Sequence, residues 1–316
     1  MNNLVIITGP TAVGKTEISI ELAKAINGEI ISADSIQVYK YMDIGSAKIK
    51  KEEMQGIKHY LIDEFEPDDE FNVNVFQKLT KKYINEIYKK GKTPIIVGGT
   101  GFYIQSVLYD IDFDETEDNH EYRKTLEQIY KDKGVQYLYN MLKEVDEESA
   151  KAIHYNNVKR VIRALEYNHQ TGKKISDHNK EQREHASPYN FKYFVLNDKR
   201  ELLYSRINKR VDCMIKEGLV DEVKSLLDKG YDRNLVSMQG IGYKEIIEYL
   251  DGKISLEEAV ELIKKNTRHF AKRQLTWFRR EKTVTMVNWD EYDYDKNKLL
   301  AGMLKDLREI NIIKDK

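Results

Sequence analysis

The feature that most constrains the fold of this chain is an eight-residue segment near its start, GPTAVGKT, at residues 9–16. It matches the phosphate-binding pattern G-x-x-x-x-G-K-[ST], whose glycines let backbone N–H groups turn towards a phosphate. An apolar run at residues 4–7 predicts a buried strand before the segment, and apolar spacing from Ile18 to Ile26 predicts a helix after it. The chain must therefore fold around a strand, a phosphate-binding loop and a helix N-terminus.

The motif assigns roles to its own residues but does not identify the substrate. Lys15 supplies a point charge to the phosphates, and the hydroxyl group of Thr16 is a ligand for Mg²⁺. The predicted phosphate-binding residues are Gly9, Pro10, Thr11, Ala12, Val13, Gly14, Lys15 and Thr16. Three reactions fit: hydrolysis of a nucleotide, transfer of a phosphoryl group, and a reaction in which diphosphate is the leaving group.

Strand and helix patterns alternate along the first part of the chain. Strands are predicted at residues 4–8, 29–33, 59–62 and 93–97, with a helix at 73–90. This alternation predicts an α/β fold with a parallel sheet covered on both faces, here a P-loop NTPase-like core. Ligands of such sheets bind beyond the carboxyl ends of the strands.

A change of composition predicts an inserted domain. Residues 110–121 carry seven acidic residues and no Lys or Arg, which indicates a linker, and only helical patterns follow, at 122–131, 135–143 and 158–169. A strand at 191–197 returns to the core. Helices at 200–216, 219–228, 243–250 and 256 to about 280, a strand at 283–289 and a polar final helix complete it. We therefore expect a core of residues 1–114 and 189–316 and a helical insertion at 115–188.

Composition narrows the class of protein. The 52 Lys and Arg against 53 Asp and Glu leave a net charge of −1, so total charge says nothing about a polyanionic partner. The single cysteine, Cys213, excludes an internal disulfide and a cysteine-based zinc site, and it suits a reducing cytosol. No signal peptide or membrane-spanning run is apparent, so we expect a cytoplasmic protein without membrane contact.

Asp34 is the candidate catalytic acid or base. A hydrolytic P-loop enzyme normally carries an acid at the end of an apolar strand, yet the strand at 93–97 runs into Gly98-Gly99-Thr100-Gly101. Asp63 is the other candidate of that kind, and we interpret it as a turn residue. Asp34 follows the second strand, and a carboxylate beside a bound diphosphate can act as a general base, worth ~10²–10⁴ in rate. The alternative is a helix-capping or turn-forming aspartate.

Basic residues are concentrated in two places. Residues 264–282 contain eight Lys or Arg and one Glu, and Lys159, Arg160 and Arg163 form a second cluster at helical spacing. Members of the first cluster that fall on neighbouring turns, with Trp277 and Phe278 between them, are Lys272, Arg273, Thr276, Arg279 and Arg280. Charged helix faces are usually only solvated. Two such clusters against a neutral background favour a polyanion instead, and nucleic acid in particular.

The motifs, taken in order, resemble those of the tRNA dimethylallyltransferases, or tRNA isopentenyl transferases. They are GPTAVGKT, SADSIQVYKYMDIGSAK, HYLID, GGTGFY, RVIRALE, GIGYKE and AKRQLTWFR, and the resemblance covers residues 3 to about 289. It departs from the family at Ser46 and Ile49, where Thr and Pro are usual. The resemblance implies transfer of a dimethylallyl group from dimethylallyl diphosphate to the exocyclic amine of the adenosine 3′ of the anticodon. It also implies an inserted helical domain and, with one cysteine, no C-terminal zinc finger.

The resemblance also implies roles for individual residues. Asp34 is the general base, Thr100 hydrogen-bonds near the reacting centre, and Mg²⁺ on Thr16 helps to neutralise the leaving diphosphate. Arg206 and Arg210, four residues apart on one helix, reach that diphosphate or form surface ion pairs. The implied tRNA-binding residues are Asp34, Ser35, Ile36, Gln37, Thr100, Arg123, Lys159, Arg160, Val161, Ile162, Arg163, Gln239, Gly240, Tyr243, Lys244, Lys272, Arg273, Gln274, Thr276 and Arg279.

The expected partners are the anticodon stem-loop of tRNA and dimethylallyl diphosphate, bound by a monomer. The adenine must leave its stack to be attacked, at a cost of a few kcal/mol. Two rival classes fit part of the sequence: a P-loop small-molecule or nucleotide kinase, and a non-catalytic, nucleotide-gated RNA-binding module. An adenylate isopentenyltransferase, which modifies free AMP or ATP, shares the crevice but has no use for the basic clusters.

Overall fold

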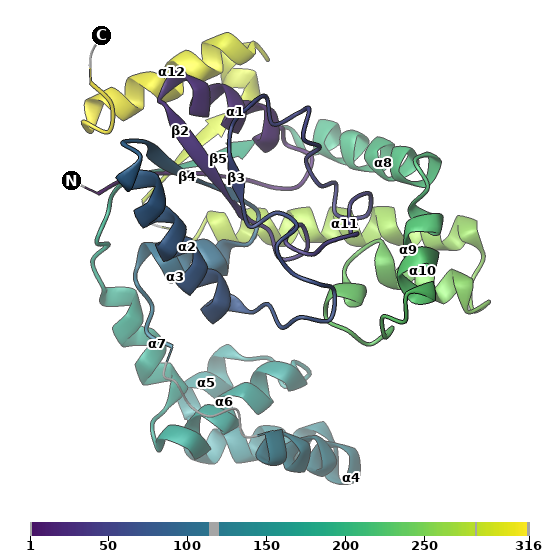
Figure 1. Cartoon of the computed structure of the whole chain (residues 1–316). Helices are drawn as coiled ribbons and strands as arrows, with labels where there is room; N and C mark the ends of the chain where they lie inside the picture. Colours follow the sequence, from purple (N-terminus) through teal and green to yellow (C-terminus); the bar gives the residue numbers. More distant parts are fainter. Residues whose placement is uncertain (1, 114–119, 282, 315–316) are drawn as a thin grey trace. The chain divides into compact units, whose positions relative to one another are not determined.

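The chain folds into two compact units in the computed structural model, which describes residues 2–113, 120–281 and 283–314 (Figure 1). The first unit comprises Met1–Val107 and Pro188–Lys316, and the second comprises Leu108–Ser187. The expected boundary at residues 114 and 115 lies outside the described residues. Half of the predicted linker, residues 114–119, and Lys282 at the end of the first basic cluster lie outside them too.

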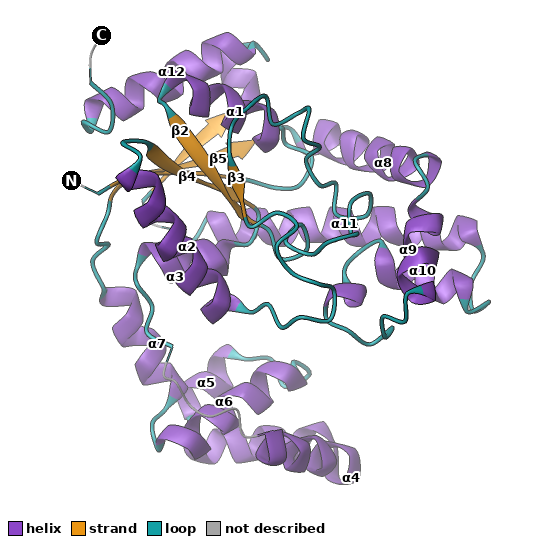
Figure 2. Ribbon diagram, in the orientation of Figure 1, coloured by secondary structure: helices purple, strands orange, loops and turns teal. Residues whose placement is uncertain are grey.

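A parallel sheet forms the centre of the first unit (Figure 2). The sheet that the described residues form has six strands in the order β3-β2-β4-β1-β5-β6, and every neighbouring pair is parallel. The strands are β1 (Asn3–Thr8), β2 (Gly28–Ala33), β3 (His59–Tyr60), β4 (Thr93–Gly98), β5 (Asn190–Asn197) and β6 (Val284–Asn288). The predicted α/β fold with a parallel core is confirmed.

Helices cover both faces of this sheet, as continuous apolar strands require. Helices α1 (Lys15–Ala25) and α12 (Lys296–Glu309) lie on one face, and α2 (Val73–Lys89) and α3 (Gly101–Leu108) lie on the other (Figure 1). Strand β1 alternates sides, so that Val5 and Ile7 join Leu22 of α1 and Met303 of α12 in one buried cluster. Register places Thr8 beside both Gly98 and Val195, and the carboxyl ends of β1, β4 and β5 are therefore level.

The remaining helices of the first unit extend from the carboxyl side of the sheet. They are α8 (Arg200–Lys216), α9 (Leu219–Asp228), α10 (Tyr243–Leu250) and α11 (Leu256–Phe278). Helix α11 begins at a capping box, in which Ser255 accepts a hydrogen bond from the N–H of Glu258 while the Glu258 carboxylate accepts one from the N–H of Ser255. Short 3₁₀ turns occur at Ser237–Gln239 and Trp289–Tyr292.

The second unit is helical and has its own core. Its described helices are α4 (His120–Val145), α5 (Glu147–Ala152), α6 (Val158–Thr171) and α7 (Ile175–Glu184). Leu126, Leu138 and Leu142 of α4 pack against Val161 and Leu165 of α6. Helix α4 is interrupted at Gly134, whose φ of 79° and ψ of 173° are not helical, so the two helices that the sequence predicts here are present with a break between them.

None of the helices that the structure describes has the length and apolar character needed to cross a membrane.

Candidate active site

The phosphate-binding loop joins β1 to α1 at the carboxyl edge of the sheet. Gly14 has φ 96°, a conformation that side-chain-bearing residues rarely adopt, and it packs against the ring of Trp289. The indole N–H of Trp289 donates a hydrogen bond of 2.8 Å to the carbonyl oxygen of Val13. Trp289 thus packs against the loop and donates a hydrogen bond to it. The sequence motifs did not reveal this role, because Trp289 lies 276 positions after Val13 in the chain.

Lys15 folds back onto its own loop. Its ammonium group donates hydrogen bonds of 2.9 Å to the carbonyl oxygens of Gly9 and Pro10. Burial and the nearby positive charge of Arg210 lower the pKa of Lys15 to about 7, and the negative charge of Asp34 opposes this shift. The loop lysine therefore lies within electrostatic range of both a second cation and the candidate base.

The two arginines of α8 have different surroundings. Arg206 forms an ion pair of 2.6 Å with the buried carboxylate of Asp198. Arg210 forms no ion pair within the described part of the chain, and part of its side chain is exposed. Desolvation by the surrounding protein atoms lowers the pKa of its guanidinium group. The ion-pair interpretation thus fits Arg206, whereas Arg210 remains available to an anion.

A large cavity lies in front of the loop, with a volume of about 1350 Å³. Val13, Gly14 and Thr16 line one side of it, and Arg206 and Arg210 line another. Within residues 2–113, 120–281 and 283–314, no group of three or more His, Cys, Asp or Glu side chains is arranged to hold a metal ion. Thr16 is nevertheless exposed and lines this cavity, and Mg²⁺ commonly takes one protein oxygen together with phosphate oxygens and water. The donor set fits a metal that arrives with a diphosphate.

Asp34 lies at the carboxyl end of β2 and organises the turn that follows. Its Oδ1 atom accepts hydrogen bonds from the N–H groups of Ile36 at 2.9 Å and Gln37 at 3.2 Å. Its Oδ2 atom forms no hydrogen bond with the described residues. One oxygen atom of Asp34 therefore stabilises the turn, as the turn-forming interpretation requires. The other oxygen atom is available to accept a proton.

Thr100 lies beside Asp34 because β2 and β4 are neighbours in the sheet. The N–H of Thr100 donates to the carbonyl oxygen of Ala33 at 3.3 Å, directly before Asp34. The strand ends approach closely: a Cβ atom at position 98 would lie 2.2 Å from that same carbonyl oxygen, so only glycine fits. Asp34 and Thr100 are therefore neighbours, as the sequence predicts for strand ends of one parallel sheet.

Gln37 connects this turn to the loop at residues 42–48. Its side-chain amide donates to the carbonyl oxygens of Ser46 at 3.2 Å and Ala47 at 3.3 Å. The same loop is held by Glu222 of α9, whose carboxylate accepts from the N–H groups of residues 43, 44 and 45 at 2.7–3.0 Å. Glu222 also accepts from the Tyr243 hydroxyl group at 2.8 Å. Only the three-dimensional arrangement identifies Glu222, because nothing in the sequence pairs α9 with this loop.

Segment 239–244 lies near this turn. A Cβ atom at Gly240 would lie 3.4 Å from the Ile36 side chain, so the two predicted parts of a base pocket are adjacent. Gln239 and Lys244 have accessible side chains, whereas Tyr243 is fully buried. Burial therefore prevents the Tyr243 side chain from contacting RNA.

Asp63, which we interpret from the sequence as a turn residue, has a backbone φ of 56°. Its carboxylate forms an ion pair of 2.5 Å with the buried Lys48.

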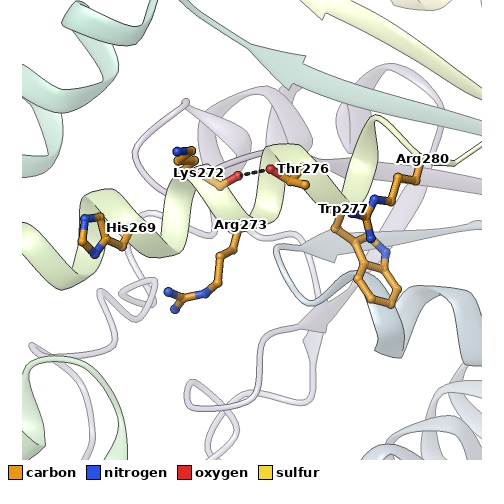
Figure 3. Close-up of a pocket in the computed structure, with 6 residues that line it drawn as sticks. All are labelled: His269, Lys272, Arg273, Thr276, Trp277 and Arg280. Atoms are coloured by element: carbon orange, nitrogen blue, oxygen red, sulfur yellow. Dashed lines mark hydrogen bonds between the residues drawn. The ribbon is translucent and has the colours of Figure 1, made fainter. Parts of the chain in front are cut away.

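Basic side chains form a stripe along the exposed face of α11 (Figure 3). A shallow pocket on this face is lined by His269, Lys272, Arg273, Thr276, Trp277 and Arg280. None of Lys272, Arg273, Arg279 and Arg280 has a carboxylate partner among the described residues. Gln274 lies on the inner face of the helix and is only 6% exposed. Its side chain was expected to contact RNA, and this burial prevents it.

The basic cluster of the second unit lies at the start of α6. Lys159, Arg160 and Arg163 are exposed, and Val161 and Ile162 are buried in the unit's core, which removes these two side chains from the RNA contacts. Cations near a helix N-terminus oppose the helix dipole, and the first turn of α6 contains no acid to compensate. Arg123, a further expected contact, instead donates two hydrogen bonds, of 2.8 and 2.7 Å, to the buried Glu166.

Comparison with known proteins identifies the family of this chain. The model of the family described as IPP transferase matches residues 37–281. The chain is 60% identical to the tRNA dimethylallyltransferase of Lachnoclostridium phytofermentans, over 99% of this chain and 100% of that protein. It is 55% identical to the enzyme of the same name from Acetivibrio thermocellus, over 94% and 95% of the two chains.

Solved structures give the same result. The tRNA isopentenylpyrophosphate transferase of Bacillus halodurans superposes with a TM-score of 0.74 and 45% identity, covering 98% of each chain. A eukaryotic dimethylallyltransferase described as acting on tRNA superposes with a TM-score of 0.83 and 30% identity, covering 99% of this chain and 81% of that one. The resemblance found in the sequence is thereby confirmed, and the chain belongs to the IPP transferase family, that of the tRNA dimethylallyltransferases.

Proposed function

We propose that this protein transfers a dimethylallyl group from dimethylallyl diphosphate to the exocyclic amine of the adenosine 3′-adjacent to the anticodon in tRNA. The bond between the allyl carbon and the diphosphate oxygen breaks, and a bond between that carbon and the adenine nitrogen forms. The nitrogen loses a proton to Oδ2 of Asp34, and diphosphate leaves. The location of Asp34 and Thr100 on adjoining strand ends beside the phosphate-binding loop carries this proposal.

The phosphate-binding loop holds the leaving group. Its backbone N–H groups and Lys15 act together with Arg210, which forms no ion pair with the described residues. They stabilise the negative charge that grows on the diphosphate as the carbon–oxygen bond breaks. Lys15 exchanges the carbonyl oxygens of Gly9 and Pro10 for phosphate oxygens when the ligand binds. Thr16 is the residue that would hold Mg²⁺, and this ion supplies further charge neutralisation of the phosphate oxygens when it is bound.

The adenine enters from the side of Asp34. Thr100 donates or accepts a hydrogen bond near the reacting amine. The walls of the base pocket are formed by Ser35, Ile36 and Gln37 together with Gln239, Gly240 and Lys244. Sequence-specific readers of RNA usually take bases out of single-stranded loops, and a flipped adenine of the anticodon loop suits such a pocket.

The exposed cations bind the RNA backbone. Lys272, Arg273, Thr276 and Arg279 of α11 contact phosphates on one side of the adenine, and Lys159, Arg160 and Arg163 of α6 contact phosphates elsewhere on the anticodon stem-loop. These exposed cations have no carboxylate partner among the residues that the structure describes, and this supports the assignment. We expect the protein to act as a monomer in the cytoplasm.

One experiment tests the reaction directly. The purified protein is incubated with Mg²⁺, labelled dimethylallyl diphosphate and unmodified tRNA, and the nucleosides are separated after digestion. We expect label in one adenosine per tRNA and in none of a control tRNA whose 3′-adjacent adenosine is replaced by guanosine. Label in free AMP at a comparable rate would indicate an adenylate isopentenyltransferase. ATP consumption that increases with tRNA concentration, without prenylation, would contradict the proposal.

A further inference from the structure

Gln274 of α11 joins the two loops that hold the proposed reacting groups. Its Oε1 atom accepts a hydrogen bond of 2.9 Å from the N–H of Thr11 in the phosphate-binding loop. Its Nε2 atom donates one of 3.0 Å to the carbonyl oxygen of Gly99, the residue before Thr100. One planar amide therefore spans the diphosphate cradle and the turn that carries Thr100.

This bridge is closely packed. A Cβ atom at Gly99 would lie 2.0 Å from Nε2 of Gln274, so the two loops leave the amide no space to shift. Trp277, one helical turn further along α11, also contacts this turn, because a Cβ atom at Gly101 would lie 2.2 Å from its ring. Helix α11 thus contacts the residues on both sides of Thr100 in the chain, Gly99 and Gly101.

We propose that Gln274 is a positioning residue for the transfer reaction, a role that rests on the proposed function. It fixes Thr100 relative to the phosphate-binding loop, and so it aligns the attacking amine with the carbon–oxygen bond that breaks. Displacement of reacting groups by about 1 Å can cost ~10²-fold in rate. Glutamine suits this role because its amide has an acceptor at one atom and a donor at the other.

Two substitutions separate positioning from stability. Gln274→Met keeps the volume and removes both hydrogen bonds. Gln274→Glu has the same shape, but its ionised form cannot donate to Gly99, whereas its protonated form restores both hydrogen bonds. Burial raises the pKa of a carboxyl group, so this protonation falls within a range of pH that an enzyme assay can reach.

The experiment measures the single-turnover rate of the full chain with saturating dimethylallyl diphosphate and tRNA, relative to wild type at each pH. We expect the Met variant to be slower by about 100-fold at every pH. We expect the Glu variant to be as slow near pH 9 and to recover at least tenfold towards pH 6. The affinity of the Glu variant for inorganic pyrophosphate stays within a few-fold of wild type, because the hydrogen bond from Thr11 is kept.

Controls separate the possible outcomes. Gln128→Glu makes the same change at an exposed residue of α4, and its relative rate should not vary with pH. A folded Met variant within about threefold of wild type would overturn the proposal, and so would a Glu variant whose relative rate is independent of pH. If the Met variant does not fold, the pH profile of the Glu variant alone decides. A wild-type chain that transfers no label contradicts the proposed function, and this arm is measured first.

Discussion

The two carboxylate oxygen atoms of Asp34 have different surroundings, and this permits a precise substitution. Oδ1 accepts two backbone hydrogen bonds, and an asparagine carbonyl group can accept the same two. Asp34→Asn therefore keeps the turn and removes the base. We expect the turnover number to fall by ~10²–10⁴ while tRNA and pyrophosphate affinities stay within a few-fold. Transfer assays and calorimetry measure this, and an asparagine variant that retains a tenth of wild-type turnover would remove Asp34 from the mechanism.

Lys15 makes diphosphate binding depend on pH. Its pKa is lowered to about 7 in the free protein, so the side chain loses its charge as pH rises above that value. A bound anion favours the charged form, so binding above pH 7 must take up a proton. We expect pyrophosphate affinity to fall between about pH 7 and 9, by at most about tenfold per pH unit.

The ligand titrates in the same range, so the matched variant is Lys15→Met, which reports only the pH dependence of pyrophosphate itself. Calorimetry in two buffers with different ionisation enthalpies measures the proton uptake directly. Equal proton uptake by the wild type and the methionine variant at pH 8 would show that Lys15 is already charged in the free protein.

At the level of elements, the loop at residues 42–48 is held in place by α9. The Glu222 carboxylate accepts four hydrogen bonds, one of which comes from Tyr243. Glu222→Gln places an amide N–H against backbone N–H groups, and we expect the loop and its contact with Gln37 to loosen. The KM for tRNA should rise about tenfold, equivalent to ~1.4 kcal/mol, with pyrophosphate affinity unchanged.

Two further variants calibrate this effect. Tyr243→Phe removes a single hydrogen bond and should raise the same KM by a smaller factor. Asp221→Asn makes the same chemical change at the neighbouring, exposed position of α9 and should have no effect. If both carboxylate variants behave alike, then the Glu222 contacts do not shape the RNA site.

Three cations on α11 or directly after it, Lys272, Arg273 and Arg279, have no carboxylate partner in the part of the chain that the structure describes. If Lys272, Arg273 and Arg279 contact phosphates, each contributes a slope of about −0.7 in log K against log salt for a single strand. Replacing all three by alanine should therefore flatten the slope by about two units and weaken binding of every tRNA alike. Binding titrations at several salt concentrations measure the slope, and a thermal melt checks the fold. An unchanged slope in a folded variant would mean that these side chains only solvate the helix.

The sequence predicts elements better than it predicts the contacts between them. The strands around β1, β2 and β4 follow from continuous apolar runs, and the GKT segment identifies the phosphate-binding loop. Helix α3 was not predicted because its first residue, Gly101, belongs to the GGTG turn. Helix α7 was not predicted because Ile175 is its only apolar residue. Gln274, Glu222 and Trp289 act across 175–276 positions of the chain, and no local pattern reports such contacts. The burial of Tyr243 was likewise visible only in the fold.

At the level of the whole molecule, a buried ion pair stabilises the sheet. Burial raises the pKa of Glu29 in β2, but hydrogen bonds from Lys92, Lys90 and Tyr60 outweigh this and lower it from an ordinary 4.5 to about 2. A lowered carboxyl pKa contributes stability above the unfolded pKa, and this contribution is lost as pH falls towards the folded value. Glu29→Gln should therefore reduce the free energy of unfolding by ~3 kcal/mol at neutral pH and by progressively less from about pH 4.5 to about 2.

Denaturant unfolding of the wild type and the Glu29→Gln variant at several pH values measures this difference. A difference that persists unchanged down to pH 3 would assign the loss to packing instead of charge.

Strand β2 carries Glu29 near its first residue and ends immediately before Asp34. Glu29 and Asp34 are five positions apart, and this corresponds to roughly 16 Å of extended backbone between their Cα atoms. The contacts that lower the pKa of Glu29 and the carboxylate that we propose as the base thus belong to opposite ends of one strand. Substitutions at Glu29, Lys90 or Lys92 should therefore change how stability depends on pH and leave the turn after Asp34 in place. Adjusting the stability of this protein and adjusting its chemistry are then separate tasks.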